Sequence, residues 1–258
     1  TGKLSYIPSE GIDDPNGANI VTPVLSQLMI INGEPEKPIR NLRFYGLTFE
    51  GTNSGGSAIS LAYATHCEFV DSEVRGVGNT AIQLEKGCYL NRILNNVIQG
   101  ADEGGIRISG DPHPDWVDFI HGNIVSFNYI SDCGGTSIHV SNTRDTVVSH
   151  NEITNTRGRT PLQVGGWSNV EVAIEGGYSV LNNHIHHVQV GSDDSGAITT
   201  AGLTTNSIIS GNLIHDVTPG FFNENVGFWF DNMSSGWTVI ENIYYNLKQS
   251  EMKLCACL

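Results

Sequence analysis

The sequence predicts an all-β fold, a right-handed parallel β-helix (solenoid) of about seven to eight coils. Two series of residues support this prediction. An asparagine follows a short apolar strand and recurs at intervals of 23 to 32 residues, at Asn96, Asn128, Asn151, Asn183, Asn212 and Asn242. The apolar centre of a later strand recurs in the same way, at Ile59, Ile82, Ile106, Ile138, Leu162, Ile198 and Phe228. A short period without helical spacing is typical of stacked coils.

Each repeat is too short to bury its own apolar face. Neighbouring repeats must therefore stack, about 4.8 Å apart, and share one continuous core. An asparagine at a bend tolerates left-handed backbone, and stacked asparagine side chains can hydrogen-bond along the axis. An antiparallel sandwich or a propeller is the alternative fold, but the two-residue hairpin turns that such folds use are scarce here.

We expect one domain over residues 1–258. Residues 1–40 are predicted to be an N-terminal cap or entry segment, in which the apolar run from Val24 to Ile31 forms a strand over the open end. Residues 41–247 should form the coils, and residues 248–258 an irregular tail. The chain starts without methionine or a signal peptide, so we expect it to begin inside a larger product or after processing.

The charge balance limits the choice of partner. Thirteen Lys and Arg stand against 27 Asp and Glu, a formal net charge of -14, which disfavours nucleic acid, anionic membrane surfaces and polyanions. No apolar run is long enough to predict a membrane span. Among five cysteines without CxxC spacing, we expect Cys67, Cys88 and Cys133 to pack as small apolar residues, with a bridge between Cys67 and Cys88 left open.

Alternation along the later strands predicts an outward row with one residue from each coil. Its members are Gln83, Arg107, His139, Gln163, Thr199 and Trp229. Such a row suits an extended glycan, because Trp229 could stack on a sugar face while the polar side chains bond to hydroxyls. Outward residues of a solenoid are also polar simply because they face water, and for Gln83 and Gln163 this interpretation stays open.

Carboxylates accompany this row. Asp194 and Glu224 both stand four residues before the inward apolar residue of their strands, on successive coils, and Asp231 ends the second of these strands. Two carboxyls one coil apart would raise the pKa of one of them. Glycoside hydrolysis needs one acid and one base or nucleophile, which such a pair supplies. The alternative is that these acids merely occupy turns, where Asp is favoured.

Two histidines hold equivalent places in successive repeats, His186 in HIHHV and His215 in LIHDV. They are either part of a site or a stack whose ring nitrogens are satisfied, and the pattern does not separate the two. No spacing matches HExxH or another zinc signature, so no metal site is expected.

The stretches DSGAITTAG, NLIHDV and GFWFDNMSSG resemble a pattern in bacterial right-handed parallel β-helix proteins that act on carbohydrates. The nearest group is glycoside hydrolase family 141, with α-L-fucosidase and xylanase activities; the β-xylosidases of family 120 are related. The resemblance implies that Asp194 and Asp231 are the catalytic acid pair and that His186 and His215 are the motif histidines. Thr199 stands where the pattern has Tyr, so the sugar contacts are expected to differ.

The leading hypothesis is a secreted or periplasmic glycosidase, fucosidase-like or xylanase-like, acting on a neutral plant or host glycan. Asp194 and Asp231 would form the carboxylate pair, with Glu224 in reserve and no cofactor. One alternative is a polysaccharide lyase or epimerase, which needs Ca²⁺ held by carboxylates and a basic residue such as Arg107. The other is a carbohydrate-binding solenoid without activity. In each case the partner is a glycan, with no nucleic acid and no membrane.

Overall fold

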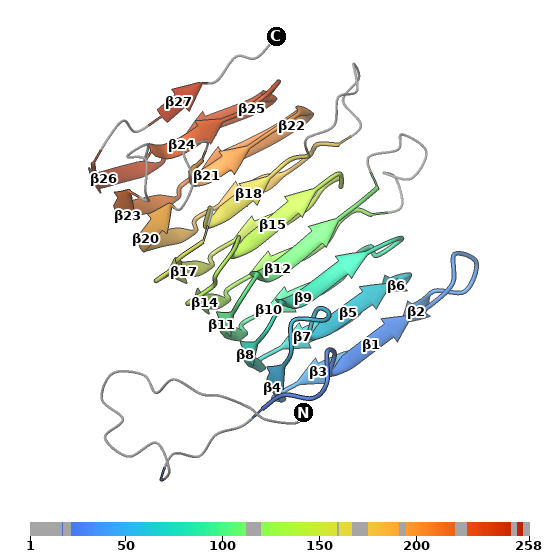
Figure 1. Ribbon diagram of the computed structural model, residues 1–258. Helices are drawn as coiled ribbons and strands as arrows, with labels where there is room; N and C mark the ends of the chain where they lie inside the picture. The colour runs from blue at the N-terminus through green and yellow to red at the C-terminus, as the bar shows by residue number, and fades with distance from the viewer. Residues whose placement is uncertain are drawn as a thin grey trace.

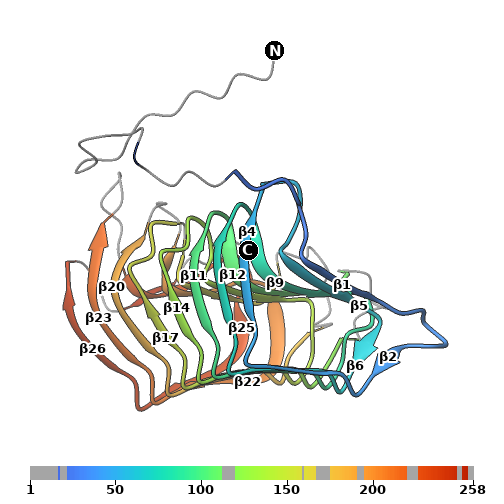
Figure 2. The same cartoon turned by 90° about the horizontal axis from the view of Figure 1, so that it is seen from below.

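The computed structural model (Figure 1) describes residues 17, 22–111, 120–158, 160–166, 175–190, 195–219, 226–248 and 252–254. Its strands stack coil upon coil along one axis, and all pairings between its named strands are parallel. Figure 2 shows the strands forming walls around a shared interior. The predicted solenoid is thereby confirmed. No helical segment within the described residues has the length and apolar character needed to cross a bilayer.

The wall that carries the predicted outward row is called sheet 1 here. In the described part of the chain it has nine strands. They are β1 (Met29–Asn32), β5 (Ile59–Ala62), β9 (Thr80–Glu85), β12 (Gly104–Ser109), β15 (Ile138–Ser141), β18 (Leu162–Val164), β21 (Gly196–Thr200), β24 (Val226–Phe230) and β27 (Met252–Leu254).

Sheets 2 and 3 complete each coil, with eight strands each among the described residues. Sheet 2 contains β3 (Arg43–Tyr45), β7 (Glu68–Val70), β10 (Arg92–Leu94), β13 (Ile124–Ser126), β16 (Val147–Ser149), β19 (Ser179–Leu181), β22 (Leu203–Ser210) and β25 (Ser235–Ile240). Sheet 3 contains β4 (Thr48–Thr52), β8 (Glu73–Val77), β11 (Val97–Ala101), β14 (Tyr129–Ser131), β17 (Glu152–Thr154), β20 (His184–Val190), β23 (Leu213–Pro219) and β26 (Ile243–Leu247). A separate pair joins β2 (Ile39–Arg40) to β6 (Ala64–Thr65).

The core follows the predicted apolar series. Partners across sheet 1 run in unbroken register from Ile59 through Ile106 to Phe228, and all three side chains are at most 1% exposed. Since every second residue of a strand points inward, this register leaves the intervening residues on the outer face.

An asparagine ladder fixes the turn between sheets 2 and 3. The side-chain Oδ1 of Asn128 accepts hydrogen bonds from both the backbone N–H and the Nδ2–H of Asn96, each at 2.9 Å, and the pattern continues as far as Asn242. The predicted stacking is confirmed. The predicted left-handed backbone belongs instead to the residue before each ladder asparagine, such as Phe127 (φ 60°) and His150 (φ 55°).

Strands extend beyond the predicted coils at both ends. β1 lies in the expected cap and pairs with β5 as part of sheet 1. The expectation of an irregular tail is wrong for Met252–Leu254, because β27 pairs with β24 and covers an edge that would otherwise leave its backbone groups unpaired.

The buried cysteines are free thiols. Cys67, Cys88 and Cys133 are fully buried, and no bridge joins Cys67 to Cys88. Burial raises the pKa of the Cys88 thiol to about 12 and that of Cys133 to about 11. All three pack as small residues in the core, as predicted.

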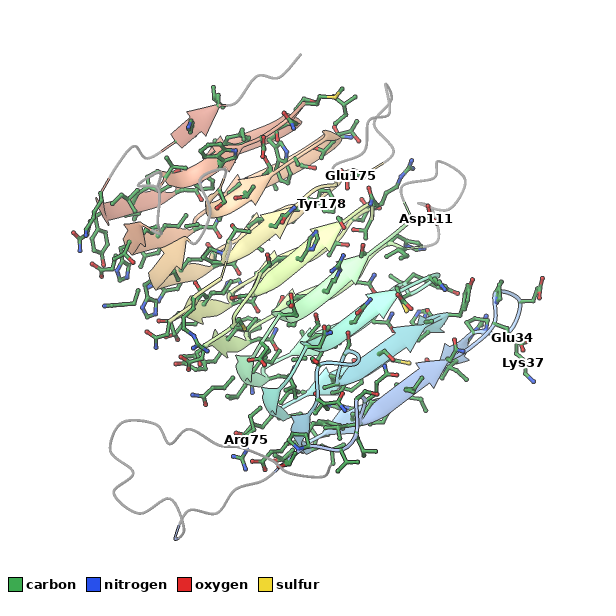
Figure 3. The ribbon with its side chains drawn as sticks, viewed as in Figure 1. Glu34, Lys37, Arg75, Asp111, Glu175 and Tyr178 are labelled. Atoms are coloured by element: carbon green, nitrogen blue, oxygen red, sulfur yellow. The ribbon has the colours of Figure 1, made fainter. Side chains whose placement is uncertain are left out.

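A buried carboxyl closes the connection between β18 and β19. The side chain of Glu175 accepts hydrogen bonds from the Tyr178 hydroxyl at 2.6 Å and from the N–H groups of Asn142 and Gly166, each at 2.7 Å (Figure 3). Burial raises its pKa. Because these bonds occupy both of its oxygens, Glu175 holds Asn142, Gly166 and Tyr178 together.

Candidate functional site: a groove on the outer face of sheet 1

A pocket of about 560 Å³ opens on the outer face of sheet 1, at the carboxyl-terminal ends of β9 and β12. The segment between β1 and β2 and the turns that follow the sheet 1 strands form its rim. Its walls are Pro35, Pro38, Tyr63, Gln83, Glu85, Lys86, Gly87, Tyr89, Arg107, Ser109, Gly110, Asp111 and Ile120. The pocket thus joins residues far apart in sequence on four neighbouring coils.

Two carboxylates line this pocket. Glu85 is the last residue of β9. Asp111, labelled in Figure 3, lies two residues beyond the end of β12 on the next coil. The Nε2–H of Gln83 donates to Oε2 of Glu85 at 3.2 Å, and Gln83 itself accepts a hydrogen bond from the Ser57 hydroxyl. This chain of bonds orients Glu85, whereas the side chain of Asp111 is exposed.

Two tyrosines supply apolar surface. Tyr63 lies in the turn after β5, and its ring packs over Gly87, where an added Cβ would meet the ring Cδ1 at 2.6 Å. Gly87 also has a φ of 68°, so glycine suits both its backbone and its neighbour. Tyr89 stacks on His121 with ring centroids 5.1 Å apart. Aromatic faces of this kind are suited to the apolar face of a sugar ring.

A second pocket, of about 660 Å³, continues the first toward the amino-terminal coils. The two share Pro35, Tyr63, Gln83, Glu85 and Lys86, and the second adds polar residues such as Gln27, Asn32 and Ser60. Together they form one elongated depression over β1, β5, β9 and β12, which we call the sheet 1 groove. Its length along the axis suits an extended ligand.

A family model described as "Right handed beta helix region" matches residues 57–244, more than half of the chain. The chain belongs to this right-handed β-helix family. No curated protein matches the sequence.

One solved structure with a fold similar to that of this chain is named "Glycoside hydrolase". The two share 15% sequence identity with a TM-score of 0.71, and the match covers 91% of this chain. It covers 51% of the other chain, so this chain spans about half the length of that protein. At this identity the likeness lies in the fold.

The residues of the predicted outward row pair with one another across sheet 1, one from each coil. Gln83, Arg107, His139, Gln163, Thr199 and Trp229 are successive partners across sheet 1. Gln83 and Arg107 line the groove. His139 is partly exposed, and burial of its ring together with the nearby Arg107 cation lowers its pKa to about 4. Its Nε2 is buried without a hydrogen-bond partner among the described residues.

The rest of the row does not present the expected open surface. Trp229 is 1% exposed beneath the Lys253 ammonium, 4.2 Å from the ring centroid, so the expectation of an exposed aromatic face is wrong. Thr199 is 2% exposed, and its hydroxyl is engaged by the Gly196 N–H at 3.0 Å and by Thr160. Gln163 is 8% exposed. Alternation predicts the direction of a side chain but not what covers it.

Of the three predicted acids, the structure describes Asp231. Asp194 and Glu224 lie outside the described residues. Asp231 directly follows β24 and is 5% exposed; its Oδ1 accepts from the Asn232 N–H at 2.7 Å, and its Oδ2 is buried without a hydrogen-bond partner in the described structure. It is distinct from the residues that line the sheet 1 groove.

His186 and His215 lie on a different wall from the row. They are partners across β20 and β23 of sheet 3, with nearly parallel rings whose centroids are 5.3 Å apart. The two histidines were predicted to hold equivalent places in successive repeats, and their pairing confirms this. They do not line the sheet 1 groove.

The sequence analysis missed Glu85, Asp111, Tyr63 and Tyr89. For Glu85 a signal existed, because it stands two residues after Gln83 and so shares the outer face of the same strand. Asp111 begins the inserted stretch DPHPDW, where insertions in a repeat often build a binding face. The tyrosines had no such signal, because they lie in turns and not in the strand pattern.

Proposed function

We propose that this chain is a glycoside hydrolase that binds a neutral oligosaccharide or polysaccharide along the sheet 1 groove. The observation that carries the proposal is the presence of Glu85 and Asp111 in one pocket with Tyr63 and Tyr89. Carboxylates beside aromatic faces are the groups that glycosidic bond cleavage uses. The fold shared with a protein named "Glycoside hydrolase" agrees with this function.

Cleavage needs one carboxyl as acid and one as base or nucleophile. The hydrogen bond from Gln83 holds Glu85 in place. We assign Glu85 as the proposed base or nucleophile, and Asp111 as the proposed acid that protonates the leaving oxygen. Arg107 and Gln83 are placed to donate hydrogen bonds to sugar hydroxyls.

The acids named by the sequence motifs remain a competing catalytic set. This set consists of Asp194, Asp231 and Glu224, with His139 as a binding residue, and would place cleavage in the carboxyl-terminal coils. The preferred sugar in either case is proposed to be a fucoside or a xyloside. A secreted or periplasmic location is part of the same proposal, because the plant or host glycans proposed as substrates lie outside the cell.

The two catalytic sets are separated by single substitutions, assayed on fucosides and xylo-oligosaccharides. We expect Glu85→Gln and Asp111→Asn to lower kcat by about 10²–10⁴-fold, while the exposed control Glu241→Gln and Asp231→Asn retain activity. Circular dichroism and melting temperatures verify folding. Activity that survives in the groove variants but vanishes in Asp231→Asn would move the site to the motif acids.

A polysaccharide lyase is the second candidate, because Arg107 and Lys86 stand in the pocket with the two carboxylates. In such an enzyme the carboxylates would hold Ca²⁺ against a uronate, and a basic side chain would remove the proton. Incubation with uronans should then give an unsaturated product that absorbs in the ultraviolet and depends on added Ca²⁺. Glycan binding without turnover of any substrate would instead favour a carbohydrate-binding solenoid.

A further inference from the structure

Three histidines converge on the outer face of sheet 3, away from the groove. His184 and His186 alternate along β20 and therefore share one face, and His215 on β23 lies beside His186 in the register. One ring nitrogen from each residue falls within 4.8 Å of the other two. The sequence pattern indicated His186 and His215. His184 joins them because it stands two residues before His186 in HIHHV and so points to the same face of β20.

The separations of the three rings fit coordination of one ion. Nε2 of His184 is 2.8 Å from Nε2 of His215, and the ring centroids of His184 and His186 are 4.1 Å apart. Around a tetrahedral zinc ion with Zn–N bonds of about 2.0–2.1 Å, two nitrogens stand roughly 3.3 Å apart. The 2.8 Å pair lies below this value and every pair lies within 4.8 Å, so small rotations of the side chains bring the nitrogens to it.

Neighbouring carboxylates orient two of these rings. Nδ1 of His215 lies 2.7 Å from Oδ2 of Asp216, which leaves its Nε2 facing His184. Oε1 of Glu152 lies 3.1 Å from Nε2 of His186, so the metal would bind Nδ1 of His186, which lies 2.8 Å from Nδ1 of His187. Tyr245 stacks on His215 with centroids 4.5 Å apart. Histidines that bind metals characteristically have a carboxylate on their second nitrogen.

We propose that His184, His186 and His215 bind one divalent transition-metal ion on the outer face of sheet 3. Imidazole nitrogens suit Zn²⁺, Ni²⁺ and Cu²⁺ rather than Ca²⁺ or Mg²⁺. Three protein ligands leave a position for water or another ligand. The chain's formal net charge of -14 also favours the approach of a cation.

The metal site is independent of the proposed glycosidase. Its residues belong to β20 and β23 of sheet 3, whereas Glu85 belongs to β9 of sheet 1. Glu85→Gln should therefore bind metal as the unmodified chain does, and loss of the histidines should leave the groove intact. A failure of the metal-site proposal would appear in metal affinity alone, and a failure of the glycosidase proposal in activity alone.

The test uses the untagged chain, freed of metal with a chelator, and Zn²⁺ in competition with a chromophoric chelator. We expect one Zn²⁺ per chain at the site, and at least tenfold weaker binding in His184→Gln, His186→Gln and His215→Gln. The matched control is His150→Gln, which alters an exposed histidine that stacks on Phe127 in another turn, and its affinity should not change. Co²⁺ in place of Zn²⁺ should give the visible absorption of a four-coordinate site.

A second measurement addresses the carboxylate. Asp216→Asn keeps all three ligands but weakens the hydrogen bond to His215, and we expect a 10–100-fold lower affinity for Zn²⁺. Circular dichroism verifies that every variant is folded. Zn²⁺ binding that survives unchanged in the folded His184→Gln/His215→Gln double variant, or no binding by the unmodified chain, overturns the proposal.

Discussion

Gly87 and Gly46 share nearly the same left-handed backbone, with φ of 68° and 65°, but have different surroundings. A Cβ at Gly87 would meet the Tyr63 ring at 2.6 Å, whereas a Cβ at Gly46 would have no atom within 4 Å. A comparison of substitutions at the two positions therefore separates the cost of backbone strain from the cost of displacing the Tyr63 ring.

We expect Gly46→Ala to lower the free energy of unfolding by roughly 1–2 kcal/mol through strain alone. Gly87→Ala should lose this amount and about 1–3 kcal/mol more, because the Tyr63 ring must move. It should also raise KM for the glycan, since that ring lines the groove. Urea unfolding and steady-state kinetics measure both effects, and equal losses in the two variants would contradict this view of Tyr63.

His139 should make stability depend on pH. Burial of the ring, aided by Arg107, lowers its pKa from an ordinary 6.5 to about 4, so between these values the unfolded chain binds the extra proton. The free energy of unfolding is therefore highest above pH 6.5, where the ring is neutral in both states. It falls as the pH drops from 6.5 toward 4, by at most roughly 1.4 kcal/mol per pH unit.

Thermal unfolding at pH 7 and pH 5 tests this dependence. The melting temperature of His139→Gln should fall less on acidification than that of the unmodified chain, because Gln does not titrate. A pH response of equal size in the two proteins would show that other groups determine it.

For individual residues, the sequence predicted whether a side chain points into the core or outward, but not how exposed it is. The register that aligns Gln83 with Arg107 follows from the repeat, because each strand has one apolar centre. The burial of Trp229 depends on Lys253, which comes from a strand that the repeat did not indicate.

Among the elements, the asparagine ladder gives the most direct test of stacking. The side chain of Asn151 receives hydrogen bonds from the N–H and the Nδ2–H of Asn128 and donates to Val125 and Asn183. It is 1% exposed, so water cannot replace these bonds.

Asn151→Ala should therefore lower the free energy of unfolding by roughly 3–5 kcal/mol, since two donors of Asn128 lose their acceptor in the interior. Asn242→Ala removes the same kind of acceptor from Asn212, but at a partly exposed position where water can replace it, and should cost about 1 kcal/mol. Chemical denaturation compares the two, and similar losses would contradict a role for burial.

The ladder was predictable because a buried asparagine leaves a strict sequence signal. The left-handed residue before it was only half predictable: Asn95, Asn182 and Gly211 are types that favour this backbone. The other three, Phe127, His150 and Glu241, are not. At these three, stacking fixes that backbone conformation, and the identity of the side chain does not reveal it.

At the scale of the whole molecule, the solenoid and its three walls follow from repeat length and alternation, whereas the location of the groove does not. The groove depends on turn residues such as Tyr63 and on the segment between β1 and β2, and these lie outside the repeat. The motif histidines were found from their equivalent places in the repeat, but the wall that they occupy became clear only from the strand pairing.

Ladder partners are separated by as few as 23 and as many as 32 residues, yet their hydrogen bonds keep lengths near 3.0 Å. Additional chain is therefore absorbed away from this corner, in the connections that enter and leave sheet 1. Insertions and deletions can remodel the ligand-facing rim while the frame stays unchanged. A protein built in this way can change what it recognises through loop length alone, without altering a single rung of its scaffold.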